Sequence, residues 1–223
     1  MNPLRKSPLH DVIATLQLEW GVHNDMPTAL QFDHGDSQRM AALGIADMSS
    51  LWRHGLKGPH SIAWLTAQGI AVPEVNSWAP LVDGGLIARL GKTEFLLEDG
   101  LIGTTARHMQ NLLADDRPHG VYPVLRQDAA LVLTGTALQQ LLRQTCSFNF
   151  RALDAAARPL VLTTMVGVPV TILPQETFDG VHYRVWCDGT YGEYLWRTLL
   201  DIAHELDGGV TGLNYLIFEG KSQ

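Results

Sequence analysis

The order of expected strands and helices predicts an α+β fold made of two ferredoxin-like halves packed together. Three observations support this prediction. A strand, a glycine turn and an apolar helix follow one another twice, each copy continues into paired strands, and an amphipathic helix closes each half. We place the halves at residues 1–117 and 118–223, joined by a polar turn at 115–120.

The repeated unit is a strand that leads through a glycine into an apolar helix. In the first copy, the expected strand 51–56 precedes Gly58 and a helix that ends near Gly69. In the second copy, the expected strand 129–133 precedes Gly135 and a leucine-rich helix. A glycine at this point lets the backbone turn without steric cost.

Paired strands follow in both copies. A glycine-containing loop between two apolar runs is typical of a β-hairpin. Such runs occur at 85–90 and 94–97, at 160–166 and 168–173, and a further strand is expected at 183–187.

The two closing helices are expected at 104–114 and 190–206. In the second, apolar side chains recur at helical spacing, at Tyr191, Leu195, Leu199, Ile202 and Leu206. Thr190 and Glu193 have the spacing of a capping box at its start.

The N-terminal entry segment is the least regular part of the pattern. We expect strands at 12–18 and 28–32, followed by a helix at 37–43. Ser37 can cap this helix and Gly44 can end it.

Composition indicates an ordinary globular protein, with 46% hydrophobic and 17% charged residues. The net charge of −7 argues against nonspecific binding to nucleic acid or to an anionic membrane surface, because both need clustered Lys and Arg. No apolar run approaches the ~20 residues that span a bilayer, and the N-terminus lacks the apolar core of a signal peptide. We therefore expect a cytoplasmic protein that binds neither nucleic acid nor membrane.

Common catalytic motifs for dinucleotides, phosphates, activated serine and zinc are absent from the sequence. His10, His23 and His34 lie in a segment with several aspartates, which could hold a divalent metal or could simply be solvated. We favour the solvated segment and expect no metal. Cys146 and Cys187 could form a redox pair, but two reduced, half-buried thiols are the simpler interpretation.

Several short stretches together are similar to one known superfamily. They are Ser7 to Asp11, the helix at 36–43 running into Gly44-Ile45-Ala46-Asp47-Met48-Ser49, then Leu56 to Pro59 and Leu90 to Leu97. These resemble the glycine-cleavage T-proteins, or aminomethyltransferases, over about residues 7–217. The second half most resembles the γ subunit of sarcosine oxidase, on the stretches 124–129, 133–135, 144–146, 158–160, 165–168 and 183–189.

The resemblance implies the folate-binding fold of aminomethyltransferases without their C-terminal barrel. It also implies a tetrahydrofolate site between the halves and one-carbon transfer from an amine. If the γ subunit is the better guide, partner subunits of a sarcosine-oxidase-like complex would carry the flavin and nicotinamide chemistry.

The resemblance also suggests site residues. The family's essential Asp precedes the strand at 86–90, where this chain offers Asp83 followed by two glycines, and Asp83 is our candidate catalytic residue. A family Glu lies in the loop before residue 183, where Glu176 or Asp179 could replace it. A carboxylate there would pair with pterin N–H groups and with the charge that develops on the amine. Further candidates for lining a folate pocket or an interface are Arg126, Arg184, Trp186 and Tyr191.

The segment from Trp186 to Gly192 has a second interpretation. It joins a strand to a helix, so its backbone N–H groups could bind a ligand carboxylate or could belong to an ordinary capped helix start.

Three functions remain open at this stage. The departures around Asp83 and in the 176–182 loop weaken the case for a transferase and favour a partner subunit with little or no activity of its own. The alternatives are a stand-alone tetrahydrofolate-dependent aminomethyltransferase and a small-molecule-binding module that has lost the chemistry.

Overall fold

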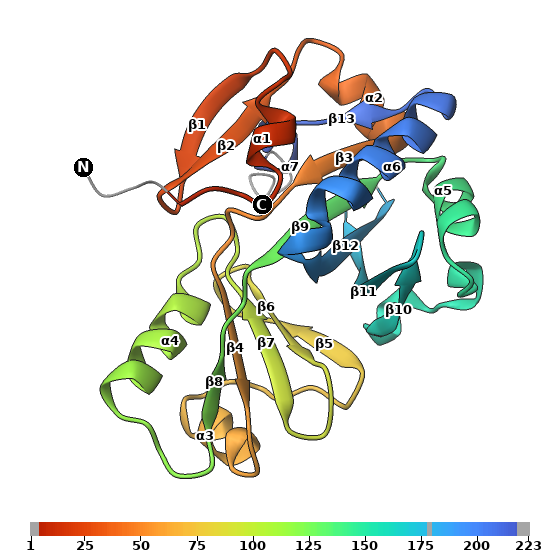
Figure 1. Cartoon of the computed structure of the whole chain (residues 1–223). Helices are drawn as coiled ribbons and strands as arrows, with labels where there is room; N and C mark the ends of the chain where they lie inside the picture. The colour runs from red at the N-terminus through yellow and green to blue at the C-terminus, as the bar shows by residue number, and fades with distance from the viewer. Residues whose placement is uncertain (1–4, 178–179, 218–223) are drawn as a thin grey trace. The chain divides into compact units, whose positions relative to one another are not determined.

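The chain folds into two units that interleave along the sequence. The computed structural model describes residues 5–177 and 180–217 (Figure 1). The first unit contains Met1–Ser50, Asp128–Ala156 and Val161–Gln223, and the second contains Leu51–Gln127 and Ala157–Leu160.

The first unit is built on a six-stranded sheet with the order β10-β11-β12-β9-β3-β13. Its neighbouring strands are antiparallel, except that β13 pairs in parallel with β3. The strands are β3 (Gly44–Asp47), β9 (Asp128–Thr134), β10 (Val161–Met165), β11 (Val168–Thr177), β12 (Gly180–Asp188) and β13 (Gly209–Val210).

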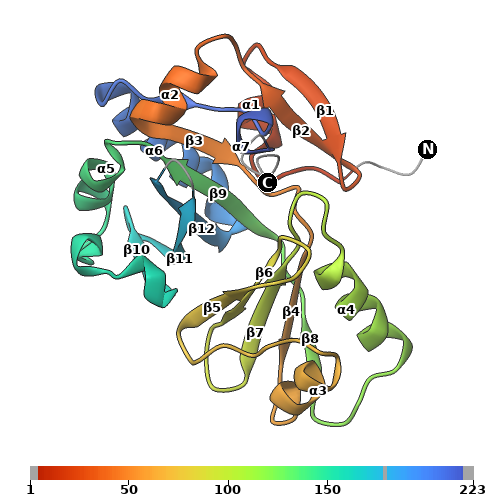
Figure 2. The same ribbon diagram turned by 180° about the vertical axis from the view of Figure 1, so that it is seen from behind.

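One face of this sheet is covered by helices, which Figures 1 and 2 show from opposite sides. Alternate strand residues such as Leu131, Ile172 and Val185 form a buried cluster with the apolar sides of three helices. These helices are α1 (His10–Ile13), α5 (Leu138–Thr145) and α6 (Gly192–Glu205). The core therefore lies between this face of the sheet and α1, α5 and α6.

The buried stripe of α6 differs in part from the predicted one. Leu195, Leu199, Trp196 and Ala203 are buried, whereas Tyr191 is 47% exposed. Tyr191 is exposed because α6 begins only at Gly192, after a short 3-10 turn, η3 (Gly189–Tyr191). The predicted capping box does not form there, since the Asp188 carboxylate accepts from the N–H of Thr190 at 2.9 Å instead.

The family-like stretches near the N-terminus meet inside the first unit. The Ser7 hydroxyl donates to the Asp47 carboxylate at 2.6 Å, and Asp47 also accepts from the backbone N–H of Ser49 at 2.9 Å. The Ser49 hydroxyl in turn accepts from the N–H of Ala130 at 3.1 Å. These hydrogen bonds fasten the N-terminal segment to strand β9.

A two-stranded hairpin extends the first unit, formed by β1 (Glu19–His23) and β2 (Met26–Gln31). The predicted strand 28–32 corresponds to β2, but the predicted strand 12–18 is wrong because residues 10–13 form α1. There, Leu9, Val12 and Ile13 recur at helical spacing and are all buried. Helix α2 (Asp36–Leu43) starts at Asp36 with Gly35 as its cap, so Ser37 does not cap it.

The second unit is a five-stranded antiparallel sheet with the order β5-β6-β7-β4-β8. The predicted hairpin at 85–97 is confirmed as β6 and β7. The apolar sides of the helices and one face of the sheet form a second core cluster around Leu56, Phe95 and Met109. Its elements are β4 (Arg53–Lys57), α3 (Ser61–Ala67), β5 (Ser77–Pro80), β6 (Leu86–Arg89), β7 (Glu94–Glu98), α4 (Thr105–Asp115) and β8 (Tyr122–Val124).

The predicted division at residues 117 and 118 falls inside the second unit, between α4 and β8. Strand β8 follows this point in the chain, yet it pairs with β4 through Gly55 and Val124. Strand β3 comes from the N-terminal part and pairs with β9 through Ile45 and Leu133. Each sheet thus takes one strand from the other part of the sequence.

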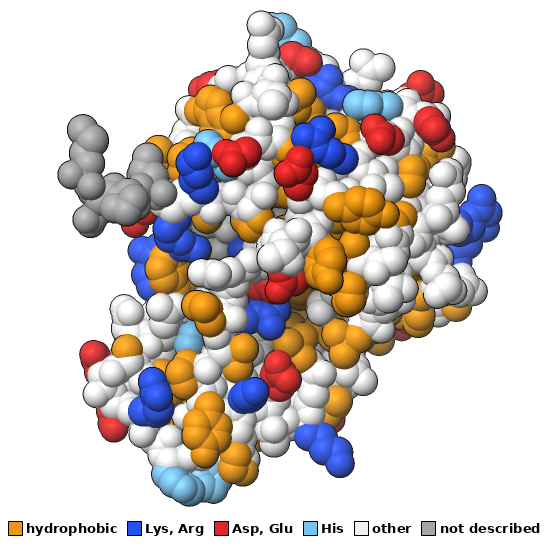
Figure 3. All heavy atoms as spheres, in the orientation of Figure 1, with side chains coloured by type: hydrophobic (Ala, Val, Ile, Leu, Met, Phe, Trp, Pro, Cys, Tyr) orange, Lys and Arg blue, Asp and Glu red, His pale blue; other side chains and the backbone are white. Residues whose placement is uncertain are grey.

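The short remaining elements are two 3-10 turns, η1 (Phe150–Ala152) and η2 (Ala155–Ala157), and α7 (Asn214–Ile217). Within the described ranges, no helix has the length and apolar character needed to cross a bilayer. On the face drawn in Figure 3, Lys and Arg side chains are scattered among acidic and apolar ones.

Candidate functional site

Two predicted site residues, Arg184 and Trp186, lie on the same face of strand β12. Their neighbours in the strand, Tyr183, Val185 and Cys187, belong to the core beneath the helices. Side chains alternate along a strand, so Arg184 and Trp186 point to the opposite face of the sheet.

Neighbouring strands complete this surface, which we call the β12 platform and define as Gln175, Arg184, Trp186, Val132 and Ala130. Arg184 pairs across the sheet with Val132, and Trp186 pairs with Ala130. The Arg184 Nε donates to the Gln175 Oε1 at 3.2 Å. The platform therefore combines a half-buried guanidinium, held in place by an amide, with buried apolar neighbours.

The accessible part of the platform, Arg184 with Gln175, suits an anionic ligand. A guanidinium binds carboxylates through two parallel hydrogen bonds. Trp186, Ala130 and Val132 are at most 5% exposed and so offer a ligand little free surface. Arg184 is half-buried, which leaves part of its side chain accessible.

The other residues predicted to bind the cofactor do not join this platform. Glu176 is exposed on β11, one residue after Gln175, and so points to the other face. Asp179 lies outside the described residues. Tyr191 follows β12 on the exposed 3-10 turn. Arg126 belongs to the second unit, where its side chain passes over Gly55 of strand β4.

The turn before α6 already contains a carboxylate. Asp188 accepts from the N–H of Thr190, and the hydroxyl of Thr190 donates to the same oxygen at 2.6 Å. These hydrogen bonds lower the pKa of Asp188. An ordinary capped turn therefore explains this segment without a bound ligand carboxylate.

Asp83, the candidate catalytic residue, caps helix α4 in the second unit. One carboxylate oxygen accepts from the backbone N–H of Thr104 at 2.8 Å and of Thr105 at 2.9 Å, and from the Thr105 hydroxyl at 2.8 Å. Burial opposes ionisation of Asp83, but these hydrogen bonds outweigh burial and lower its pKa. The negative charge also complements the positive end of the helix dipole.

Close packing explains the glycines beside Asp83. Gly84 has a φ of +84°, which favours glycine. A Cβ on Gly85 would lie 2.4 Å from the carbonyl oxygen of Glu98, and one on Gly103 would lie 2.9 Å from the Asp83 carboxylate. The loops before β6 and after β7 thus touch through their backbones, and this contact sets the position of Asp83.

Two further carboxylates here were not found by sequence reasoning. Asp99 is 1% exposed, and burial raises its pKa although the N–H groups of Ala106 and Arg107 donate to it. Glu98 is equally buried and pairs with Arg53 across the sheet at 3.2 Å. The sequence signal for them was the Glu98-Asp99 pair directly after the apolar run 95–97. Carboxylates that continue a buried strand need hydrogen-bonding or charged partners.

Several side chains of the histidine-rich segment make internal contacts, and both cysteines are buried. Asp33 and Asp36 form ion pairs with Arg39, and the ring centroids of His10 and Trp20 lie 5.2 Å apart. Among residues 5–177 and 180–217, no group of three or more side chains is placed to bind a metal ion. Both thiols are buried. Burial raises the pKa of Cys146, and burial together with nearby carboxylates raises that of Cys187 to about 12. Such thiols stay protonated and are poor nucleophiles.

The fold is shared with two solved structures, although sequence comparisons find no match. No known family profile and no curated protein matches the sequence. Among solved structures, aminomethyltransferase T of the glycine cleavage system from Bartonella henselae superposes with a TM-score of 0.71 at 14% identity, over 95% of this chain. The chain has the fold of aminomethyltransferase T. It spans 60% of the length of that enzyme.

A second structure matches over nearly its full length. One chain of the heterotetrameric sarcosine oxidase from Corynebacterium sp. U-96 superposes with a TM-score of 0.67 at 19% identity. The match covers 92% of this chain and 98% of that chain. The predicted α+β fold is therefore confirmed.

Proposed function

We propose that this chain is a folate-binding-type subunit of a sarcosine-oxidase-like complex in one-carbon and amine metabolism, with little or no transfer activity alone. The observation that carries the proposal is the near end-to-end match with one chain of a heterotetrameric oxidase. The aminomethyltransferase matches over only 60% of its length, so a whole-enzyme activity has less support.

The state of the carboxylates supports low activity of the isolated chain. A pterin presents N–H donors that need a carboxylate with free acceptor capacity. In the second unit, Asp83, Glu98 and Asp99 are engaged by the start of α4 or by Arg53. Glu98 and Asp99 cannot turn toward a ligand without giving up these internal partners. Asp83 is held through Oδ2, whereas its buried Oδ1 has no hydrogen-bond partner in the described part of the chain.

Tetrahydrofolate fits the β12 platform in one respect. Arg184, held by Gln175, would bind an acidic group such as the glutamate carboxylates of folate. This chain would hold the ligand in place, while groups on other chains would supply the redox chemistry.

Two other functions remain as alternatives. A stand-alone tetrahydrofolate-dependent aminomethyltransferase is supported by the shared fold and would need a carboxylate to be released from its present partners. A small-molecule-binding module without chemistry is supported by the engaged carboxylates and by the platform.

The proposal is tested by purifying the tagged protein from its native source under mild conditions. A flavoprotein should co-purify in fixed stoichiometry, visible by its flavin absorption, and the chain alone should not transfer a one-carbon unit to tetrahydrofolate. Isolation of the chain without partners, together with transfer activity that Asp83→Ala abolishes, would support the stand-alone enzyme instead.

A further inference from the structure

Strand β1 has one edge that no other strand covers. Within residues 5–177 and 180–217, β1 pairs only with β2, in a two-stranded sheet. Figures 1 and 2 both show β1 on the outer side of β2. An uncovered edge offers backbone donors and acceptors to another strand.

The turn of the hairpin shows which groups point outward. Asn24 and Asp25 have φ values of 50° and 60°, as a two-residue type I′ turn requires. The flanking pair, His23 and Met26, therefore exchanges hydrogen bonds, and the next pair, Val22 and Pro27, does not. Pro27 has no N–H, which agrees with this alternation.

The same alternation continues to Trp20, which pairs with Ala29 without hydrogen bonds. The N–H and C=O groups of Trp20 and Val22 thus point away from β2. The side chains of both residues are also accessible, with Trp20 39% and Val22 66% exposed. His10 lies against the Trp20 ring at 5.2 Å and limits its motion.

Strand β1 carries little protection against pairing. Natural edge strands are commonly blocked by lysine, proline or an inward-pointing charge. Its sequence, Glu19-Trp20-Gly21-Val22-His23, contains no lysine, arginine or proline, and the irregularity in its register occurs only between Glu19 and Trp20.

We propose that the outer edge of β1 pairs antiparallel with β1 of a second copy of this chain, about a two-fold axis at Gly21. In this register, Trp20 of one copy faces Val22 of the other and exchanges backbone hydrogen bonds with it. Glu19 faces His23, which places an acidic group opposite a basic one. Gly21 faces Gly21 at the axis, where no side chain obstructs the approach. The strand is self-complementary, as a two-fold interface requires.

The test is a concentration series of the full chain by sedimentation velocity and light scattering, from about 1 to about 100 µM. We expect the mass to rise from 24.5 kDa toward twice that value. Val22→Lys should raise the dimer dissociation constant at least about tenfold, because two unpaired charges would enter the interface. The matched control is Val82→Lys, the same change at a fully exposed valine of the second unit, which should leave the dimer intact.

Hydrogen exchange of the wild-type protein provides a measurement that does not depend on a variant folding. The amides of Trp20 and Val22 should become more protected as concentration rises. A monomer throughout the series, a dimer unaffected by Val22→Lys, a dimer lost in Val82→Lys, or concentration-independent exchange at these amides would each overturn the proposal.

Discussion

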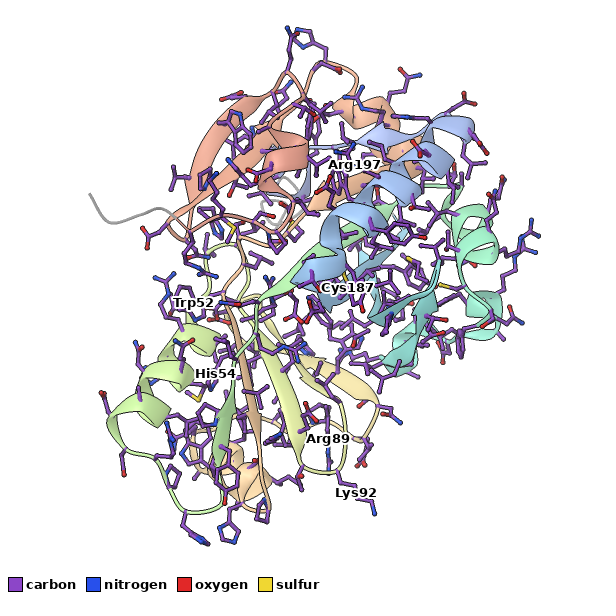
Figure 4. The ribbon with its side chains drawn as sticks, viewed as in Figure 1. Trp52, His54, Arg89, Lys92, Cys187 and Arg197 are labelled. Carbon is purple, nitrogen blue, oxygen red and sulfur yellow. The ribbon has the colours of Figure 1, made fainter. Side chains whose placement is uncertain are left out.

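Histidine 54 should make the protein sensitive to acid. It lies on β4, two residues before Leu56 of the second core cluster, on the face of the strand that packs against α4 (Figure 4). It is 4% exposed, and its Nε2 has no hydrogen-bond partner in the described part of the chain. Burial lowers its pKa from 6.5 to about 4.

The direction of the effect follows from proton binding. Below pH 6.5 the unfolded chain binds a proton at this histidine, whereas the folded protein does so only near pH 4. Stability is therefore lost as the pH falls from about 6.5 to about 4. At about 1.4 kcal/mol per pH unit, the loss is about 3 kcal/mol.

The substitution His54→Leu should remove this contribution. We expect its free energy of unfolding, from urea titrations followed by tryptophan fluorescence, to fall less than that of wild type between pH 6.5 and pH 4.5. At pH 7 the variant should be more stable by about 1 kcal/mol, because an unpaired polar atom leaves the core. His108→Leu, at an exposed position of α4, is the control and should keep the wild-type slope. An unchanged slope in His54→Leu would refute the reasoning.

Three further predictions concern stability and reactivity. Asp36→Ala should lower the free energy of unfolding by about 3–5 kcal/mol, because this buried carboxylate accepts from the N–H groups of Phe32, Asp33 and Gly212 and pairs with Arg39. At the exposed Asp33, substitution by Ala should lower the free energy of unfolding by less than about 1 kcal/mol. Equal losses in the two variants would contradict this prediction. Gly85→Ala should destabilise the protein by more than about 2 kcal/mol, because the new Cβ would lie 2.4 Å from a carbonyl oxygen. Gly91→Ala should be nearly neutral in the same urea titration, because its Cβ would have no neighbour closer than 4.0 Å. Cys187 should resist alkylation at pH 8 until the chain is denatured, as mass spectrometry would show, because its pKa is raised to about 12; rapid labelling of the native protein would contradict its burial.

Regular elements were predictable because their signals are local. The hairpin 85–97 and helix α5 follow from glycine placement and apolar spacing within a few residues. The pairing of β3 with β9 and of β8 with β4 was not predictable in this way, because strand partners distant in sequence leave no local pattern. Residues 10–13 were misjudged for a related reason, since a short apolar run fits a strand and a helix equally well.

The candidate site was only partly predictable. Arg184 and Trp186 are two residues apart in a strand, so their shared face follows from alternation alone. The partner of Arg184, Gln175, became apparent only from the register of β11 and β12. The role of Asp83 could not be derived from its position in the chain, because its carboxylate is engaged by the start of a helix more than twenty residues later.

Calorimetric titration of the purified chain with tetrahydrofolate tests the central claim most directly. We predict binding with a micromolar Kd, about −8 kcal/mol, weakened about tenfold or more by Arg184→Ala. It should be unchanged by Arg197→Ala, at an exposed position of α6. Absence of heat at about millimolar ligand would contradict a folate-binding role, and equal affinity of wild type and Arg184→Ala would contradict the β12 platform as its site.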